Sequence, residues 1–216
     1  QEIPDPREYD ALISSGEQVS VALLAMTLRN EKVNSKSYTA FQLGLRTDDY
    51  HGKARINSID TKNILKDISA DITPVITGFQ GINEEGDITT LGRGGSDTSA
   101  VALAVALEAE ECQIYTDVDG VYTTDPNVYE KAKKIDKLTF EEMLELSSLG
   151  AKVLQIRSVE FASKYNMPIR VKSSFTNDEG TLINGEENME DALISGVTHT
   201  NDDATVSYTH LRAHET

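Results

Sequence analysis

The chain has 216 residues, enough for one domain of ordinary size or for one domain and part of another. Its 20 basic and 36 acidic residues give a formal net charge of −16, and so acidic a surface repels nucleic acid and anionic membranes. We therefore expect neither as a partner. The single cysteine, Cys112, excludes an internal disulfide and indicates a reducing, cytoplasmic location.

The ends of the chain carry no targeting signal that we recognise. Residues 1–8 lack the basic and apolar regions of a signal peptide, and the chain does not begin with methionine. No continuous apolar run reaches the ~20 residues that span a bilayer. We expect the chain to begin inside a longer protein.

The first third of the chain mixes predicted helices and strands. Residues 12–28 carry apolar side chains at helical spacing, which predicts an amphipathic helix with Glu17 near its beginning. Residues 74–77 have the composition of a buried strand, which the sequence G-F-Q-G ends. Weaker patterns predict a short strand or turn over residues 38–43, an exposed strand over 54–59 and a short helix over 64–68.

Residues 90–102, which read T-L-G-R-G-G-S-D-T-S-A-V-A, predict a glycine-rich turn that leads into a buried helix. Ser96 or Asp97 is expected to cap that helix. Its free N–H groups suit a phosphate, and Arg93 adds a cation for a carboxylate or phosphate. The pattern matches neither G-x-x-x-x-G-K-[ST] nor G-x-G-x-x-G. It predicts an anion site of another type, although such a turn can also be only a tight connection.

The rest of the chain continues the alternation of strands and helices. The predicted elements are a strand over residues 113–117, a turn over 118–122, a helix over 140–149 capped by Thr139 and Glu142, a helix over 152–164, and a strand over 169–171. This order predicts an α/β fold with a largely parallel sheet between helices. Because ligands bind beyond the carboxyl ends of such strands, we expect Gly78 and residues 92–97 and 116–122 to converge at one edge.

The charged residues near these loops suit phosphoryl transfer to an amino acid. Phosphoryl transfer needs positioning and charge neutralisation more than covalent chemistry by the protein. Arg93 could hold a carboxylate while Glu17 holds an ammonium group. Asp97 could orient lysine ammonium groups or hold Mg²⁺ against nucleotide phosphates.

Each of these residues also has a plain structural interpretation. Glu17 could be a helix-favouring carboxylate in a first turn, and Lys152 a solvated charge at a helix end. Phe79 and Tyr122 could be core aromatics, and Asp117 a turn former. No metal-binding set is predicted, and Cys112 is expected to be a buried structural thiol.

Five ordered motifs between residues 75 and 162 resemble aspartokinases of the amino acid kinase superfamily. They are V-I-T-G-F-Q-G, T-T-L-G-R-G-G-S-D-T-S-A, Y-T-D-V-D-G-V-Y-T-T-D-P, E-M-L-E-L-S-S-L-G-A-K-V-L and R-S-V-E-F-A. Weaker matches extend the resemblance from about residue 12 to residue 183, roughly four-fifths of the chain.

The resemblance implies an amino acid kinase-like fold and the ATP-dependent phosphorylation of L-aspartate to 4-phospho-L-aspartate, with Mg²⁺. This reaction opens the route to lysine, threonine and methionine. The implied aspartate-binding residues are Glu17, Phe79, Arg93, Ser96 and Asp97. The implied nucleotide-binding residues are Gly94, Gly95, Thr116, Asp117, Tyr122 and Lys152. Asp97, Lys152 and Arg93 are the implied catalytic residues, and Asp97 organises the catalytic lysines.

The sequence departs from the family pattern at both ends. The family's N-terminal K-[FY]-G-G-T-S string is absent, and Asn127 follows T-T-D-P where the family often has arginine. The string L-I-S-G-V-T-H-T-N-D-D-A resembles the first strand of an ACT regulatory module. We therefore expect a partial kinase domain over residues 1–184, a linker and the start of an ACT module over 185–206, and a non-native or disordered tail over 207–216.

These departures imply that this chain alone is inactive, because a lost phosphate-binding lysine removes a contact worth ~3 kcal/mol or more in the transition state. The intact protein is expected to be an active, feedback-regulated homo-oligomer. Two other interpretations stay open. One is another kinase of the superfamily, acting on acetylglutamate, glutamate, uridylate or carbamate. The other is a non-catalytic protein that binds an amino acid or a nucleotide.

Overall fold

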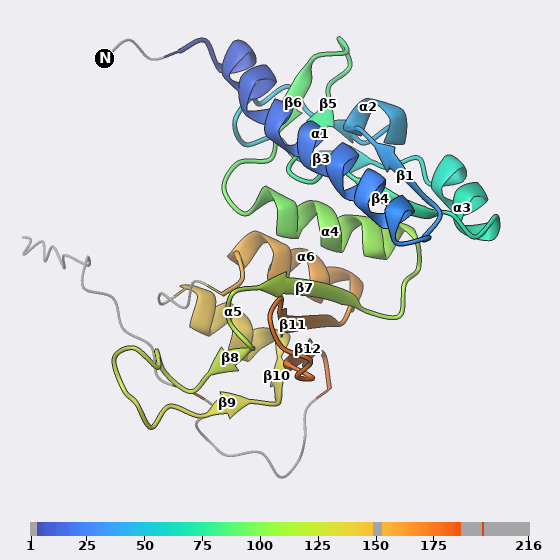
Figure 1. The fold of residues 1–216 in the computed structure, drawn as a ribbon. Coiled ribbons are helices and arrows are strands. Elements are labelled where there is room, and N and C mark those ends of the chain that lie inside the picture. Colours follow the sequence, from blue (N-terminus) through green and yellow to red (C-terminus); the bar gives the residue numbers. More distant parts are fainter. Residues whose placement is uncertain (1–3, 149–152, 187–195, 197–216) are drawn as a thin grey trace, which may run out of the picture.

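The computed structural model describes residues 4–148, 153–186 and 196. Figure 1 shows two groups of elements, one above the other, with α4 (Gly95–Ala106) between them. Helices α1 to α3 and strands β1 to β6 form the upper group, and the later elements form the lower group. Helix α4 contacts β5 of the upper group, and α6 and β7 of the lower group. It therefore joins the two groups.

Helix α1 (Pro6–Asn30) is the longest element of the upper group. The Asp5 carboxylate caps it by accepting hydrogen bonds from the backbone N–H groups of Arg7 and Glu8. Pro6 occupies the first turn, where a missing N–H costs nothing. On the side that faces the strands, Val21 and Ala25 of α1 pack against Val75.

The upper group contains a parallel pair of strands and a mixed sheet. Strand β1 (Ser35–Tyr38) pairs in parallel with β4 (Thr73–Ile76). The mixed sheet has the order β3-β2-β5-β6, and within it only β2 and β5 are parallel. Its strands are β2 (Arg46–Thr47), β3 (Ile56–Ser58), β5 (Gln80–Ile82) and β6 (Ile88–Thr90), and two short helices complete the group, α2 (Ala40–Leu43) and α3 (Lys62–Ser69).

The lower group is built around a second mixed sheet with the order β10-β12-β11-β7. The pairs β10–β12 and β11–β7 are parallel, whereas β11–β12 is antiparallel. Strands β8 and β9 form a separate antiparallel pair. The elements are β7 (Cys112–Thr116), β8 (Val121–Tyr122), β9 (Lys134–Ile135), β10 (Lys137–Thr139), α5 (Phe140–Ser148), α6 (Ile156–Tyr165), β11 (Ile169–Ser173) and β12 (Thr181–Asn184).

The largest hydrophobic core lies in this lower group. It includes the fully buried Met143 of α5, Val159 of α6 and Ile169 of β11. Val101 of α4 belongs to the same core. Helix α4 therefore has one face fixed in the lower core, while its first turn stays near the upper group.

The predicted α/β class is confirmed, and the sheets prove to be mixed rather than one largely parallel sheet. The Thr139–Glu142 capping box is confirmed, since each backbone N–H donates to the other residue's side-chain oxygen. The predicted cap of α4 is wrong. Gly94 is the N-cap, in the left-handed conformation, and Ser96 and Asp97 lie in the first turn.

Helix α1 is the one described helix that is long and apolar enough, by length and composition only, to cross a membrane. Its most apolar 18-residue window has a mean hydropathy of 1.4. The core helices of other proteins pass the same test. The buried residues of α1 are the polar Asp10 and Ser14 and the apolar Val21 and Ala25. These four residues face the rest of the protein.

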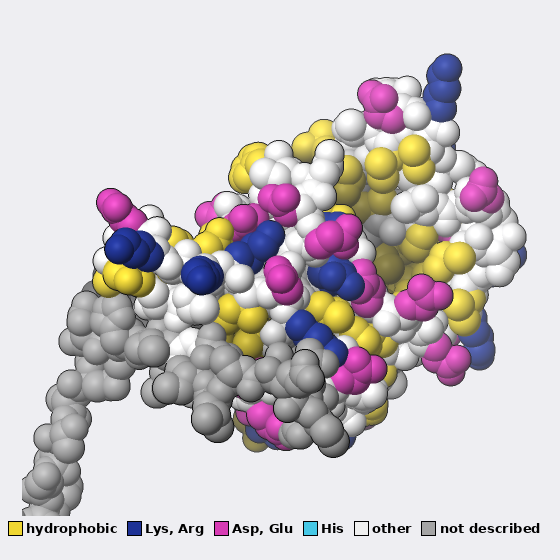
Figure 2. Space-filling model, turned by 90° about the horizontal axis from the view of Figure 1, so that it is seen from below, with side chains coloured by type: hydrophobic (Ala, Val, Ile, Leu, Met, Phe, Trp, Pro, Cys, Tyr) yellow, Lys and Arg dark blue, Asp and Glu magenta, His cyan; other side chains and the backbone are white. Residues whose placement is uncertain are grey.

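Several predicted features fall outside the described residues. They are Gly150 and Lys152, which lie in the interval 149–152, most of the predicted linker and ACT start, and the whole tail over 207–216. Figure 2 shows one face of the molecule, on which Lys and Arg side chains are interspersed with Asp and Glu. On this face the excess of acidic residues does not form a patch of one sign.

Candidate functional site

The glycine loop, residues 91–94, has a backbone that side chains would disrupt. Gly92 has φ of 80° and Gly94 has φ of 68°, in the left-handed region that glycine adopts without strain. A Cβ atom at position 92 would lie 2.7 Å from the carbonyl oxygen of Gly52. A Cβ atom at position 94 would lie 1.8 Å from Cγ of Gln155. Both glycines are therefore required by conformation and by space.

Arg93 lies between these two glycines and is exposed. Helix α4 begins immediately after them, and no side chain caps its amino end. The partial positive charge of that end is therefore open to a ligand. An exposed guanidinium beside an uncapped helix end is an arrangement that binds carboxylates and phosphates.

Asp97 brings a carboxylate into the first turn of α4. Its partial burial raises the pKa of the carboxyl group, and a hydrogen bond from the backbone N–H of Gln155 acts in the opposite direction. Gln155 immediately precedes α6 and is three residues after Lys152. The structure thus places Asp97 close to the segment that leads from residue 152 into α6, although Lys152 itself lies outside the described residues.

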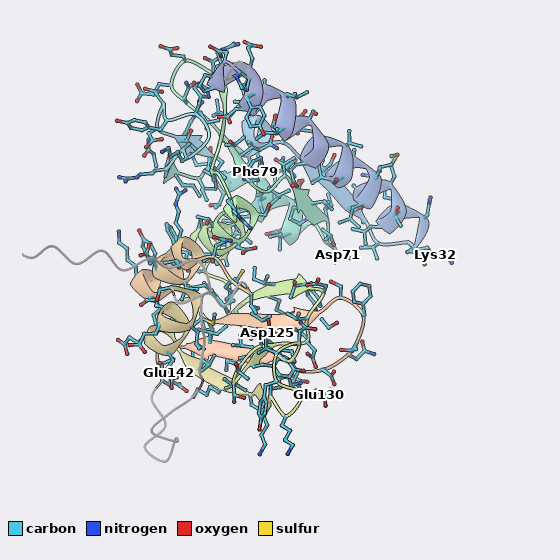
Figure 3. All side chains as sticks on the ribbon, turned by 90° about the vertical axis from the view of Figure 1, so that its left-hand side faces the viewer. Lys32, Asp71, Phe79, Asp125, Glu130 and Glu142 are labelled. Atoms are coloured by element: carbon cyan, nitrogen blue, oxygen red, sulfur yellow. The ribbon has the colours of Figure 1, made fainter. Side chains whose placement is uncertain are left out.

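Phe79 has a strained backbone, with φ of 70°. Its N–H donates to Oγ of Ser99 (3.1 Å), and its carbonyl oxygen accepts from the N–H of Leu91 (2.8 Å). These bonds hold Phe79 against both α4 and the glycine loop, and Figure 3 marks it between α1 and α4. Strained residues of this kind concentrate at functional sites, because the surrounding structure must enforce them.

Ser96 and Gly95 share this contact region with Phe79. A Cβ atom at position 78 would lie 3.1 Å from Oγ of Ser96, and one at position 95 would lie 3.0 Å from the Phe79 ring. The structure therefore brings Phe79, Ser96 and the glycine loop together. Their roles in ligand binding remain predictions.

Glu17 reaches this region from α1. Gln80, the neighbour of Phe79, donates from Nε2 to the carbonyl oxygen of Ser14 (3.2 Å). Gln18 donates from its own Nε2 to Oε1 of Gln80 (3.4 Å). The turn of α1 that carries Glu17 thus lies against the segment that carries Phe79. Within the described part of the chain, no ion pair joins Glu17 to Arg93.

The predicted nucleotide loop follows β7. Thr116, the last residue of β7, donates from its hydroxyl to Oδ1 of Asp117 (3.1 Å). The Tyr122 hydroxyl donates to Oδ1 of Asp119 (2.8 Å), which raises the pKa of Tyr122. In Figure 1 β7 ends on the side of the molecule where α4 begins, so Thr116 and the glycine loop lie at the same side.

One expectation about these loops is wrong. Gly78 follows β4, residues 92–97 follow β6, and residues 116–122 follow β7, and these strands belong to three different sheets. The loops therefore do not meet at one edge of a parallel sheet. Gly78 and Ser96 come into contact because α4 packs across the upper group, not because adjacent strands end together.

Two residues that hold the glycine loop were not predicted from the sequence. Asp10 is fully buried and accepts hydrogen bonds from the backbone N–H and the hydroxyl of Thr90, just before the loop. Arg157 of α6 donates from Nη1 to the carbonyl oxygen of Leu91 (2.8 Å) and from Nη2 to that of Ala54 (2.6 Å). In the sequence both look like ordinary helix charges, and only their tertiary contacts distinguish them.

Comparison with known proteins agrees with this geometry. The model of the amino acid kinase family matches residues 2–173. An aspartate kinase of Stutzerimonas stutzeri is 59% identical over 205 residues, covering 94% of this chain and 50% of that protein. The chain spans about half the length of the curated relatives it matches. The resemblance to aspartokinases is therefore confirmed over most of this chain.

Solved structures show the same likeness. Escherichia coli aspartokinase III in complex with aspartate and ADP matches with a TM-score of 0.80 and 35% identity, covering 86% of this chain and 42% of that one. Aspartate kinase from Synechocystis matches with a TM-score of 0.76 and 42% identity, over 88% of this chain and 31% of that one. The fold of the described residues is thus shared with both enzymes.

Proposed function

This chain belongs to the amino acid kinase family, and we propose that the full protein is an aspartate kinase. It would transfer the γ-phosphoryl group of ATP to the side-chain carboxylate of L-aspartate, giving 4-phospho-L-aspartate and ADP. The observation that carries the proposal is the exposed Arg93 beside the uncapped end of α4, packed against strained Phe79. Relatives that are 59% and 57% identical, an aspartate kinase and an aspartokinase, support the same activity.

The amino acid would be held by its two backbone charges. Arg93 offers a planar pair of donors that fits the α-carboxylate, and Glu17 offers a carboxylate for the α-ammonium group. Phe79 and Ser96 would line the same pocket. A substrate without an ammonium group, such as carbamate, gives Glu17 no partner, which favours an amino acid over the other acceptors of this family.

The reaction needs no nucleophile or base from the protein. The side-chain carboxylate of aspartate is ionised at neutral pH, so its oxygen can attack the γ-phosphorus directly while the bond to the ADP oxygen breaks. The protein contributes positioning and charge neutralisation. We assign neutralisation to the amino end of α4, which begins at Gly94 and Gly95, and to Lys152, with Asp97 orienting the lysine ammonium groups.

The nucleotide would bind along Thr116, Asp117 and Tyr122 as its Mg²⁺ complex. Mg²⁺ in kinases takes most of its ligands from phosphates and water and few from protein carboxylates. MgATP therefore enters the proposal as a substrate that brings its own metal ion.

The remaining parts of the proposal concern the whole protein. Residues 1–184 would form part of the catalytic domain, and residues 185–206 would lead into an ACT regulatory module. The protein would act in the cytoplasm as a homo-oligomer, at the first step of lysine, threonine and methionine biosynthesis.

The test is the substitution Arg93→Ala in the full-length protein. Loss of a charge-assisted bidentate contact is expected to raise the KM for aspartate by about 10- to 100-fold, with less than about a threefold change in the KM for ATP. Steady-state ADP release measures both constants. Arg55→Ala removes an exposed arginine from a neighbouring segment and serves as the control. Equal effects of Arg93→Ala on both substrates would contradict the assignment.

A further inference from the structure

Asp10 is a fully buried carboxylate on the inner face of α1. Its Oδ2 accepts from the N–H of Gly52 (2.9 Å) and the N–H of Thr90 (2.9 Å), and lies 3.0 Å from Nδ1 of His51. Its Oδ1 accepts from the Thr90 hydroxyl (2.6 Å). A buried charge is costly unless it is fully hydrogen-bonded, and here both oxygens are satisfied.

The partners of Asp10 lie on the two segments that enclose the glycine loop. Thr90 ends β6 and is followed by Leu91, Gly92 and Arg93. Gly52 belongs to the segment that supports the loop from the other side, since its carbonyl oxygen closes the space beside Gly92. Ala54 joins the two segments by donating its N–H to the carbonyl oxygen of Thr90 (2.9 Å). Asp10 therefore fixes α1 to the base of the loop that carries Arg93.

The same helix carries Glu17. Residues seven apart lie two turns apart on nearly the same face of an α-helix, and a continuous helix holds them about 10 Å apart along its axis. The bond from Gln80 to Ser14 ties the intervening turn to the neighbour of Phe79. The position of Glu17 relative to Arg93 is therefore set through α1, with Asp10 as the contact nearest to the loop.

We propose that Asp10 is a positioning residue that sets the separation between Glu17 and Arg93. The proposal rests on the proposed function, in which these two residues hold the ammonium and carboxylate groups of one amino acid. Because Asp10 is fully buried and its oxygens are engaged by groups of this chain, it would act only through the two charged residues. It thus contributes to selectivity for an amino acid whose two charges match that separation.

The test is Asp10→Asn in the full-length protein. The amide keeps the size of the side chain but removes its charge. If the NH₂ group faces the N–H groups of Gly52 and Thr90, both bonds are lost; if it faces the Thr90 hydroxyl, that hydroxyl becomes the acceptor and neutral hydrogen bonds replace charge-assisted ones. We expect the KM for aspartate to rise about tenfold or more, with less than about a threefold change in kcat and in the KM for ATP. A purely structural role would instead lower the active fraction, and with it kcat, at unchanged KM values.

Asp87→Asn is the matched control. Asp87 also joins α1 to the β5–β6 hairpin, through Arg7 (2.6 Å), but it lies in the turn of that hairpin, at the opposite end of β6 from Thr90, and the pair is partly exposed. We expect no change in the KM for aspartate. A rise equal to that of Asp10→Asn would show that any loosening of α1 has the same effect, and would overturn a specific role for Asp10.

The double variant Asp10→Asn/Arg93→Ala tests the route of the effect. If Asp10 acts through Arg93, its substitution adds less than about threefold to the KM of Arg93→Ala, because coupled residues are not additive. If the two increases in the KM for aspartate multiply in the double variant, the proposal is overturned. Thr90→Val replaces Asp10→Asn if that variant does not fold. It removes only the hydroxyl bond and should raise the KM for aspartate in the same direction by about threefold.

The outcomes separate the two proposals. If Arg93→Ala raises the KM for aspartate and neither Asp10→Asn nor Thr90→Val does, the positioning role alone is wrong. If Arg93→Ala leaves that KM unchanged, both the binding assignment and the positioning role are wrong.

Discussion

Asp97 shows how a single residue can oppose the stability of the fold that holds it. Its carboxylate is partly buried, and burial raises the pKa of the group above its usual value. The ionised form is therefore less stable in the folded protein than in the unfolded chain. Such a group destabilises the fold at every pH above its folded pKa, and the penalty disappears as the pH falls below the unfolded pKa.

We expect Asp97→Asn to stabilise the full-length protein without ligands at pH 8, and to do so less at pH 4, close to the ordinary pKa of an aspartate carboxyl group. Urea unfolding at the two pH values measures the difference. The same substitution should lower kcat/KM for aspartate by about 100-fold or more, since it removes the charge that, in the proposed function, orients the lysine ammonium groups. A variant less stable than the wild type at pH 8 would show that the Gln155 hydrogen bond outweighs burial.

At the scale of elements, the glycine loop is held between two helices. Asp10 reaches it from α1 through Thr90, and Arg157 reaches it from α6 through the carbonyl oxygen of Leu91. Arg157 also bonds the carbonyl oxygen of Ala54, so one guanidinium joins three segments of the chain. Helix α4 adds the bond from Phe79 to Ser99. The site is therefore positioned by α1, α4 and α6. Helix α1 packs in the upper group, whereas α4 and α6 pack in the lower core.

Arg157→Lys tests this bridge. A lysine ammonium keeps the charge but lacks the planar pair of donors that reaches two carbonyl oxygens, so at least one carbonyl loses its partner. We expect unfolding in urea to show a loss of about 1–2 kcal/mol. Arg170→Lys is the control, because its ion pair with Glu111 is partly exposed and should be worth less than about 1 kcal/mol. Equal losses would argue against a special role of Arg157.

At the scale of the whole molecule, the sequence predicted the long periodic elements better than the short ones. Helices α1 and α5 were found because their apolar spacing extends over several turns. The β5–β6 hairpin was missed, because Q-G-I and I-T-T are too short to show a period of two. The amino end of α4 was misplaced, because a left-handed glycine cap looks the same in sequence as any loop glycine.

The same limits apply to the candidate site. Arg93 and Asp97 were predicted from the glycine-rich turn, Glu17 from charges that suit an amino acid, and the family resemblance added their roles. Asp10 and Arg157, by contrast, resemble surface charges of a helix. Their burial and long-range bonds exist only in the folded chain. The positioning residues of a loop are therefore harder to predict from one sequence than the residues that the loop presents.

The alkylation rate of Cys112 measures how readily the whole lower core opens. It is buried in that core, and burial raises the pKa of its thiol to about 11. At pH 8 a thiol of that pKa is only about 0.1% thiolate, so alkylation by iodoacetamide requires opening of the core. We expect the native protein to react at least about 100-fold more slowly than the protein in 8 M urea. Rapid native labelling would mean that β7 and α4 separate easily.

The contact between Gly94 and Gln155 limits how this protein can change over generations. Any side chain at position 94 would collide with Cγ of Gln155, whose backbone N–H in turn bonds Asp97. A side chain at 94 would therefore displace the start of α6 and would also be strained by the left-handed backbone, so a smaller residue at 155 alone does not make position 94 tolerant. Position 94 should therefore stay glycine over generations, whichever residue occupies 155.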